Sequence, residues 1–94
     1  MSNTNKILVD EMDDGWDEKL QKEGFEAYSV KKLRIEGLKL HSDFSVINYA
    51  KKNKMVLITR DTESGVACNE NNIPCILLDK DEIFKIVLNK LNQF

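Results

Sequence analysis

Two short apolar segments of this chain each end in a carboxylate: KILVDE at residues 6–11 and MVLITRD at residues 55–61. Short apolar runs of this kind are typical of buried parallel strands. In an open α/β sheet the carboxyl ends of the strands meet in one crevice, and two acids placed there repel each other unless a cation or hydrogen bonds offset the repulsion. We therefore expect function around Asp10 and Asp61.

The rest of the chain predicts strands that alternate with helices. Residues 31–41 are the exception and are predicted as a loop with about one helical turn, because Gly37 interrupts any helix. Alternating elements imply right-handed crossovers. We expect a single domain over residues 1–94, a three-layer α/β/α fold with a mostly parallel four-stranded sheet in the order 2-1-3-4. The predicted elements are strands at 6–10, 25–30, 55–60 and 73–78, and helices at 16–24, 42–54 after the N-cap Ser42, 63–71 and 81–91.

Length and composition fit one small globular domain. The 94 residues are 41% hydrophobic and 32% charged, which suits one compact core. A formal charge of -2 provides no general attraction for nucleic acid, so such a contact needs a local basic patch or a metal. Two cysteines and the absence of an apolar leader or membrane span predict a reducing cytoplasm and no membrane partner. The single histidine, His41, gives little support for a zinc site or a serine triad.

Three motifs, in their order and spacing, resemble those of PIN-like domains. They are LVDE at residues 8–11, SDFSVINYA at residues 42–50, and VLITRD at residues 56–61 with Glu63 close behind. Full-length members of that family are metal-dependent ribonucleases and include the toxins of toxin–antitoxin pairs. The resemblance spans nearly the whole chain, and it implies a PIN-like fold with RNA and an antitoxin-like protein as candidate partners.

The resemblance also implies an acidic metal site for one or two magnesium or manganese ions. Hard divalent cations prefer carboxylate and water oxygens. Such a metal polarises a phosphodiester and lowers the pKa of an attacking water, which is the chemistry of hydrolytic RNA cleavage. The candidate catalytic and metal-binding residues are Asp10, Asp43 and Asp61, with Glu11 and Glu63 as further metal ligands.

Polar and basic side chains near the predicted crevice are candidate substrate-binding residues. Lys32 and Arg34 lie in the segment nearest the crevice, and Arg60 lies beside Asp61. All three are therefore candidates for binding RNA phosphates. Thr59 is placed to orient a ligand carboxylate or a water through its hydroxyl. The alternative is a solvated charged loop, because no exposed aromatic residues are interleaved with these cations.

Each acid also has a purely structural interpretation. Asp10 would cap the following turn, Asp43 would favour the positive end of its helix, and Asp61 would N-cap the next helix. In addition, residues 31–41 replace a longer helical section that carries a further acid in the PIN-like family. A non-catalytic PIN-like module that binds a protein or RNA partner is therefore the alternative hypothesis.

A second resemblance, to phosphoacceptor receiver domains, rests on Asp10, Glu11 and Asp61. Those signalling domains hold magnesium with acids after the first strand and accept a phosphoryl group after the third. They also need a fifth strand and a lysine that follows a cis-type turn. Here Lys80 comes after the fourth strand and the only proline is Pro74, at the start of that strand. The PIN-like hypothesis is therefore preferred.

The remaining apolar residues are predicted to serve packing. Cys68 and Cys75 are predicted as buried small apolar residues. The apolar face of the last helix would close the sheet or supply a surface for a homodimer, and the sequence leaves both open. The aromatic residues predicted to be core or half-buried are Trp16, Phe25, Tyr28, Phe44 and Tyr49.

Overall fold

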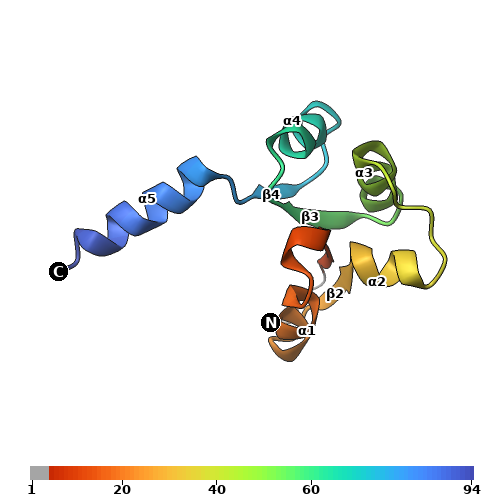
Figure 1. The fold of residues 1–94 in the computed structure, drawn as a ribbon, viewed down its shortest axis with the longest axis horizontal. Coiled ribbons are helices and arrows are strands. Elements are labelled where there is room, and N and C mark those ends of the chain that lie inside the picture. The colour runs from red at the N-terminus through yellow and green to blue at the C-terminus, as the bar shows by residue number, and fades with distance from the viewer. Residues whose placement is uncertain (1–4) are drawn as a thin grey trace.

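The computed structural model describes residues 5–94, which form a four-stranded, all-parallel sheet flanked by helices (Figure 1). The strands lie in the spatial order β2-β1-β3-β4, which confirms the predicted fold class and strand order. The strands are β1 (Lys6–Val9), β2 (Glu26–Ser29), β3 (Met55–Thr59) and β4 (Cys75–Leu77). The helices are η1 (Glu11–Asp13, a 3-10 helix), α1 (Trp16–Lys22), α2 (Val30–Ile35), α3 (Asp43–Lys52), α4 (Thr62–Glu70) and α5 (Lys80–Leu91).

Alternating strand side chains divide the core between the two faces of the sheet. Leu8 and Leu57 are completely buried on one face, in a cluster that includes residues of α2, α3 and α4. On the other face Ile7 and Val9 are buried in a cluster against which Trp16 of α1 packs. Successive side chains of a strand point to opposite faces, so the central strand β1 contributes to both clusters. This explains why β1 reads as a continuous apolar run.

The connections place β1 and β3 side by side in the centre of the sheet. Lys6 pairs with Met55, and Val9 pairs with Ile58. Just beyond the last pair, the Asp10 amide donates to the Ile58 carbonyl at 2.9 Å. From β1 the chain proceeds to one edge of the sheet, and from β3 it proceeds to the other. The carboxyl ends of β1 and β3 are therefore the topological switch point, where ligands bind in open α/β sheets.

Residues 31–41, predicted as a loop with about one helical turn, contain a longer helix than predicted, because α2 begins at Val30 and ends at Ile35. Ser29 ends β2 and is also the N-cap of α2, because its hydroxyl accepts from the Lys32 amide at 3.2 Å. Val30 and Leu33, one helical turn apart, are buried. Gly37 has a φ of 109° just beyond the helix end, a conformation that favours glycine. It therefore follows the helix instead of preventing it.

The packing predictions hold in part. Cys68 is completely buried and Cys75 is partly buried. Four of the five predicted aromatic residues are at least half-buried. The prediction for Phe44 is wrong, since this residue is 74% exposed on α3. All residues of α5 are exposed, so this helix does not close the sheet. Among residues 5–94, no helix combines the length and the apolar character needed to cross a membrane.

An ion pair connects α1 with α2. The buried Asp17 carboxylate contacts the Lys32 ammonium at 2.7 Å, and it also accepts from the Gly15 amide at 3.1 Å. Burial by itself would raise the pKa of Asp17, but these contacts outweigh it and lower the pKa below its ordinary value. Lys32 also contacts the exposed Glu18 at 2.9 Å.

We expect Lys32→Met to lower the melting temperature at pH 7, because it leaves Asp17 buried without its cation. A carboxyl with a lowered folded-state pKa contributes stability above its unfolded pKa and loses it as pH falls through the folded value. In thermal unfolding measured from pH 7 to pH 2, the difference in melting temperature between Lys32→Met and the wild type should therefore become smaller in acid. The control is Lys31→Met, a neighbouring exposed lysine, which should change little; equal effects of the two variants would contradict this role for the ion pair.

Candidate functional site

A buried hydroxyl connects the ends of the two central strands. Thr59 is completely buried, and its Oγ1 donates to Asp10 Oδ2 at 2.8 Å. The same oxygen accepts from the Asp61 amide at 3.1 Å. One threonine at the end of β3 therefore fixes the carboxylate that follows β1 and the backbone of the acid that follows β3.

Asp10 and Asp61 are also helix caps, as their structural interpretation predicted. Asp10 Oδ1 accepts from the Glu11 amide at 2.8 Å at the start of η1. Asp61 Oδ1 accepts from the Glu63 amide at 3.1 Å, and its Oδ2 accepts from the Ser64 hydroxyl at 3.0 Å. A carboxylate has about four lone-pair sites, and these contacts occupy two on each acid. Capping thus orients both carboxylates and leaves them capacity for another ligand.

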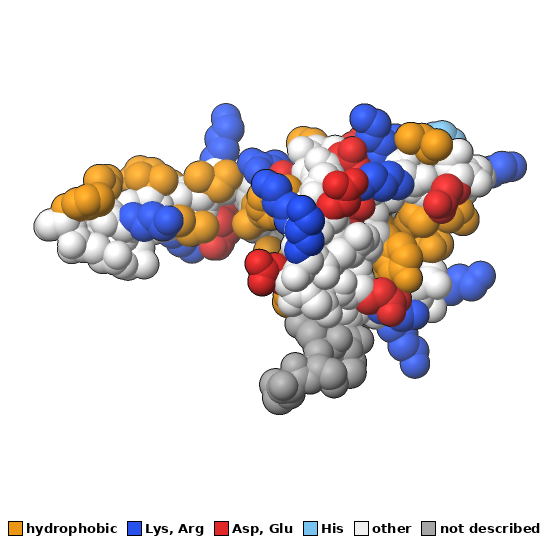
Figure 2. All heavy atoms as spheres, turned by 90° about the horizontal axis from the view of Figure 1, so that it is seen from below, with side chains coloured by type: hydrophobic (Ala, Val, Ile, Leu, Met, Phe, Trp, Pro, Cys, Tyr) orange, Lys and Arg blue, Asp and Glu red, His pale blue; other side chains and the backbone are white. Residues whose placement is uncertain are grey.

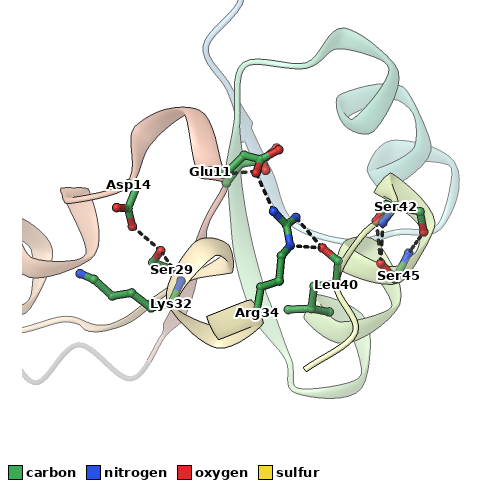
Figure 3. A network of polar contacts seen from close by, with 9 residues as sticks. Glu11, Asp14, Ser29, Lys32, Arg34, Leu40, Ser42 and Ser45 are labelled. Atoms are coloured by element: carbon green, nitrogen blue, oxygen red, sulfur yellow. Dashed lines mark hydrogen bonds and ion pairs between the residues drawn. The ribbon is translucent and has the colours of Figure 1, made fainter. Parts of the chain in front are cut away.

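Asp43 reaches the same place from α3. Ser42 and Ser45 form a reciprocal capping box, with contacts of 3.0 and 3.1 Å, that begins α3 just before Asp43 (Figure 3). The negative charge of Asp61 is close enough to contribute to the raised pKa of Asp43. The structure therefore brings together acids from two segments that are separated by a helix and a strand.

The local charge perturbs the titration of Asp43. Partial desolvation and the negative charges of Asp61, Asp10 and Glu63 together raise the pKa of Asp43. Because the Asp43 residue is exposed, we interpret the neighbouring carboxylates as the more important of these causes. The four acids thus create a local excess of negative charge at the switch point of the sheet.

The donor chemistry at this point suits a hard divalent cation. Within residues 5–94, no three or more His, Cys, Asp or Glu side chains are arranged to hold a metal ion. Magnesium, however, keeps several waters and commonly takes only one or two protein carboxylates. Asp43 and Asp61 provide such a pair of oxygen donors, and Asp10 and Glu63 add negative charge beside them.

Glu11, the other candidate ligand, is held by a cation. Its Oε2 contacts Arg34 Nη1 at 2.7 Å, and the Arg34 guanidinium also donates to the Leu40 carbonyl at 2.9 and 2.5 Å. Figure 3 shows Arg34 extending from α2 to both partners. Glu11 therefore helps to anchor the segment between α2 and α3.

The other two predicted phosphate-binding cations are also in ion pairs. Lys32 contacts Asp17 and Glu18, as described above. The Arg60 guanidinium contacts both oxygens of the buried Asp13 at 3.0 and 3.1 Å. The pairing of Asp13 with a side chain 47 positions later has no local signal in the sequence. To bind phosphate, these three cations, Lys32, Arg34 and Arg60, would each have to give up the carboxylates that they now contact.

A pocket of about 250 Å³ lies between α3 and α4, next to the acids. Asp43 and Glu63 belong to its lining, as do the exposed Phe44 and Lys51. Phe44 was predicted to be core or half-buried, and its place in this pocket was not predicted. The complete lining is Asp43, Phe44, Ile47, Asn48, Lys51, Glu63, Ala67, Asn71 and Ile73.

Comparisons of this chain with protein-family models, curated proteins and solved structures find no match.

We expect Asp43→Asn to stabilise the protein at pH 7, by less than about 1 kcal/mol after solvent screening, because it removes repulsion among the acids. Because the pKa of Asp43 is raised on folding, the variant should be more stable than the wild type above the folded-state pKa. This difference in stability should disappear below the unfolded value near 3.8. The measurement is chemical unfolding at pH 7 and pH 3.

The matched control is Asp81→Asn, which changes an acid in the first turn of α5. It should be neutral or destabilising, because an acid normally favours a helix N-terminus. Stabilisation of equal size by both substitutions would contradict electrostatic crowding at Asp43.

Removal of the Thr59 hydroxyl tests the connection between the strands. Thr59→Val keeps the shape but leaves Asp10 Oδ2 and the Asp61 amide without this partner, and we expect a loss of about 1–3 kcal/mol in the free energy of unfolding. Thr59→Ser retains the hydroxyl and should recover the Asp10 hydrogen bond, seen as a smaller loss in urea unfolding. If the valine variant is as stable as the serine variant, the hydroxyl has no such role.

Proposed function

We propose that this chain is a PIN-like, metal-dependent ribonuclease that hydrolyses RNA phosphodiesters at the acidic switch point of its sheet. The observation that supports this most is the position of Asp43 beside Asp61, with Asp10 and Glu63 close enough to raise the pKa of Asp43. Acids from separate segments that perturb one another in this way are characteristic of functional sites. The motif resemblance independently selects Asp10, Asp43 and Asp61.

In this proposal the acids have different roles according to their position. Asp43 and Asp61 would hold magnesium or manganese, and Thr59 keeps the Asp10 carboxylate oriented by a hydrogen bond. The bound cation, when present, supplies Lewis-acid polarisation of the phosphodiester and a lowered pKa for the attacking water. Asp10 and Glu63 accept hydrogen bonds from the waters around it.

The pocket between α3 and α4 supplies a place for the nucleotide next to the cleaved bond. Phe44 exposes its ring there and is suited to stack on an unpaired base, and Lys51 is a cation suited to a phosphate. Stacking of this kind selects single-stranded RNA over a duplex. The proposed substrate is therefore a single-stranded segment, and a toxin-like, cytoplasmic role beside an antitoxin-like protein belongs to the same proposal.

The second candidate function is a non-catalytic PIN-like module that binds a protein or RNA partner. It is favoured by the ion pairs of Lys32, Arg34 and Arg60, which neutralise the cations that a phosphate backbone would need. It is also favoured by the lack, within residues 5–94, of three metal-ligating side chains arranged around one point.

Manganese titration with thermal unfolding and a labelled single-stranded RNA separates the two functions. The variant is Asp43→Asn/Asp61→Asn, because asparagine keeps the capping ability of position 61. We expect Mn²⁺ to raise the melting temperature of the wild type, by an amount equivalent to about 2.7 kcal/mol at a hundred times the dissociation constant, and not that of the variant. RNA cleavage should occur only with the wild type.

Asp81→Asn serves as the control and should behave as the wild type in both assays. Stabilisation by Mn²⁺ without cleavage would support the binding module. The absence of any metal-dependent stabilisation would contradict the proposed metal site.

A further inference from the structure

The last helix of the chain lies apart from the rest of the fold. Figure 1 shows α5 projecting beyond β4, and Figure 2 shows hydrophobic side chains along it. The radius of gyration is 14.1 Å, whereas a compact domain of this length has about 12 Å. A 12-residue helix is marginal in water without tertiary packing. The exposed apolar side chains of α5 are Ile83, Phe84, Ile86, Val87, Leu88 and Leu91, which are 39–64% exposed.

The apolar residues of α5 form a broad stripe. Ile83, Val87 and Leu91 repeat every four residues, and Phe84 and Leu88 lie beside them. At 100° per residue these five positions cover an arc of about 140°. A coiled-coil seam uses a narrower stripe of two positions per heptad, whereas a helix that packs on a sheet uses a wide one. The shape of the stripe therefore favours a sheet face as its partner.

One half of a sheet face in the same chain lacks a covering helix. On the face that carries Ile7 and Val9, α1 packs on β1 and β2. On the β3–β4 half of that face, the buried Ile58 pairs with Ile76, which is 49% exposed. By alternation, Val56 and Leu78 belong to this half as well, and both are partly buried. Within residues 5–94, the β3–β4 half of this face is therefore apolar, and it is exposed to solvent mainly at Ile76.

The connection between β4 and α5 is short. Only Leu78 and Asp79 separate them, and Asp79 already caps α5 by accepting from the Glu82 amide at 2.9 Å. Short connections of this kind favour the exchange of a terminal element between identical chains.

We propose that α5 packs on the β3–β4 face of a second copy of this chain, and that the two copies exchange this helix reciprocally. Six apolar side chains, each about half exposed, amount to on the order of 500 Å² on α5. Each receiving face exposes less, on the order of 200 Å², because Ile58 is buried and Val56 and Leu78 are partly buried. Reciprocal exchange buries two helix stripes and two receiving faces, on the order of 1,400 Å² in total, which lies in the size range of specific, stable interfaces. A second copy is the occupant because each copy carries both the unpartnered stripe and the open face.

Light scattering after size exclusion tests this exchange on the full chain at micromolar concentration. We expect a dimer for the wild type and monomers for Val87→Glu on the stripe and Ile76→Glu on the receiving face. The control is Val66→Glu, which alters an apolar side chain of α4 that is 51% exposed and should leave the dimer intact. Circular dichroism on the same samples verifies that each variant is folded.

An equimolar mixture of the two monomeric variants sharpens the test. In a mixed dimer, the normal α5 of the Ile76→Glu chain meets the normal face of the Val87→Glu chain, so we expect dimers to reappear in part. A dimer that survives Ile76→Glu would show helix-to-helix pairing and would overturn the proposal. A monomeric wild type would overturn it as well; protection of the α5 amides from hydrogen exchange would then indicate that the helix folds back on its own sheet.

Discussion

The hydrogen bonds of the buried Thr59 hydroxyl are the contacts on which the candidate site depends. This hydroxyl donates to the Asp10 carboxylate and accepts from the Asp61 amide, and these two residues follow different central strands. The pairing of β1 with β3 brings the three residues together, and burial makes the two hydrogen bonds costly to lose. The positions of both acids therefore follow from the register of the sheet.

The acids of this chain differ in the charge of their neighbours. Asp13 and Asp17 are buried, and each is neutralised by a cation from another element. At the switch point, by contrast, Asp43 has carboxylates as its charged neighbours, and they raise its pKa. Ion pairs are the usual means by which a fold accommodates acids. Groups with perturbed pKa values gather at functional sites, and we therefore propose that this group of acids binds a cation from solution.

The sequence predicted the sheet and the meeting of the acids because both follow from local patterns. Apolar runs that end in acids identify β1 and β3, and the crossover rules then place Asp10 beside Asp61. The start of helix α2 at Val30 was missed because Ser29 serves both as a strand residue and as an N-cap. The pairing of Asp13 with Arg60 depends on distant residues. The prediction for Phe44 was wrong and the role of α5 stayed open, because an amphipathic pattern shows which side of a helix is apolar and not what covers that side.

We propose that Asp43 and Asp61 share a cation site. A carbon-detected NMR titration of the Asp43 carboxyl, with and without Mg²⁺, tests it most directly. The account predicts a pKa above the ordinary aspartate value in the absence of metal and a marked fall of that pKa when Mg²⁺ is added, because the cation favours the charged form. A pKa of Asp43 that is ordinary without metal and insensitive to Mg²⁺ would contradict it.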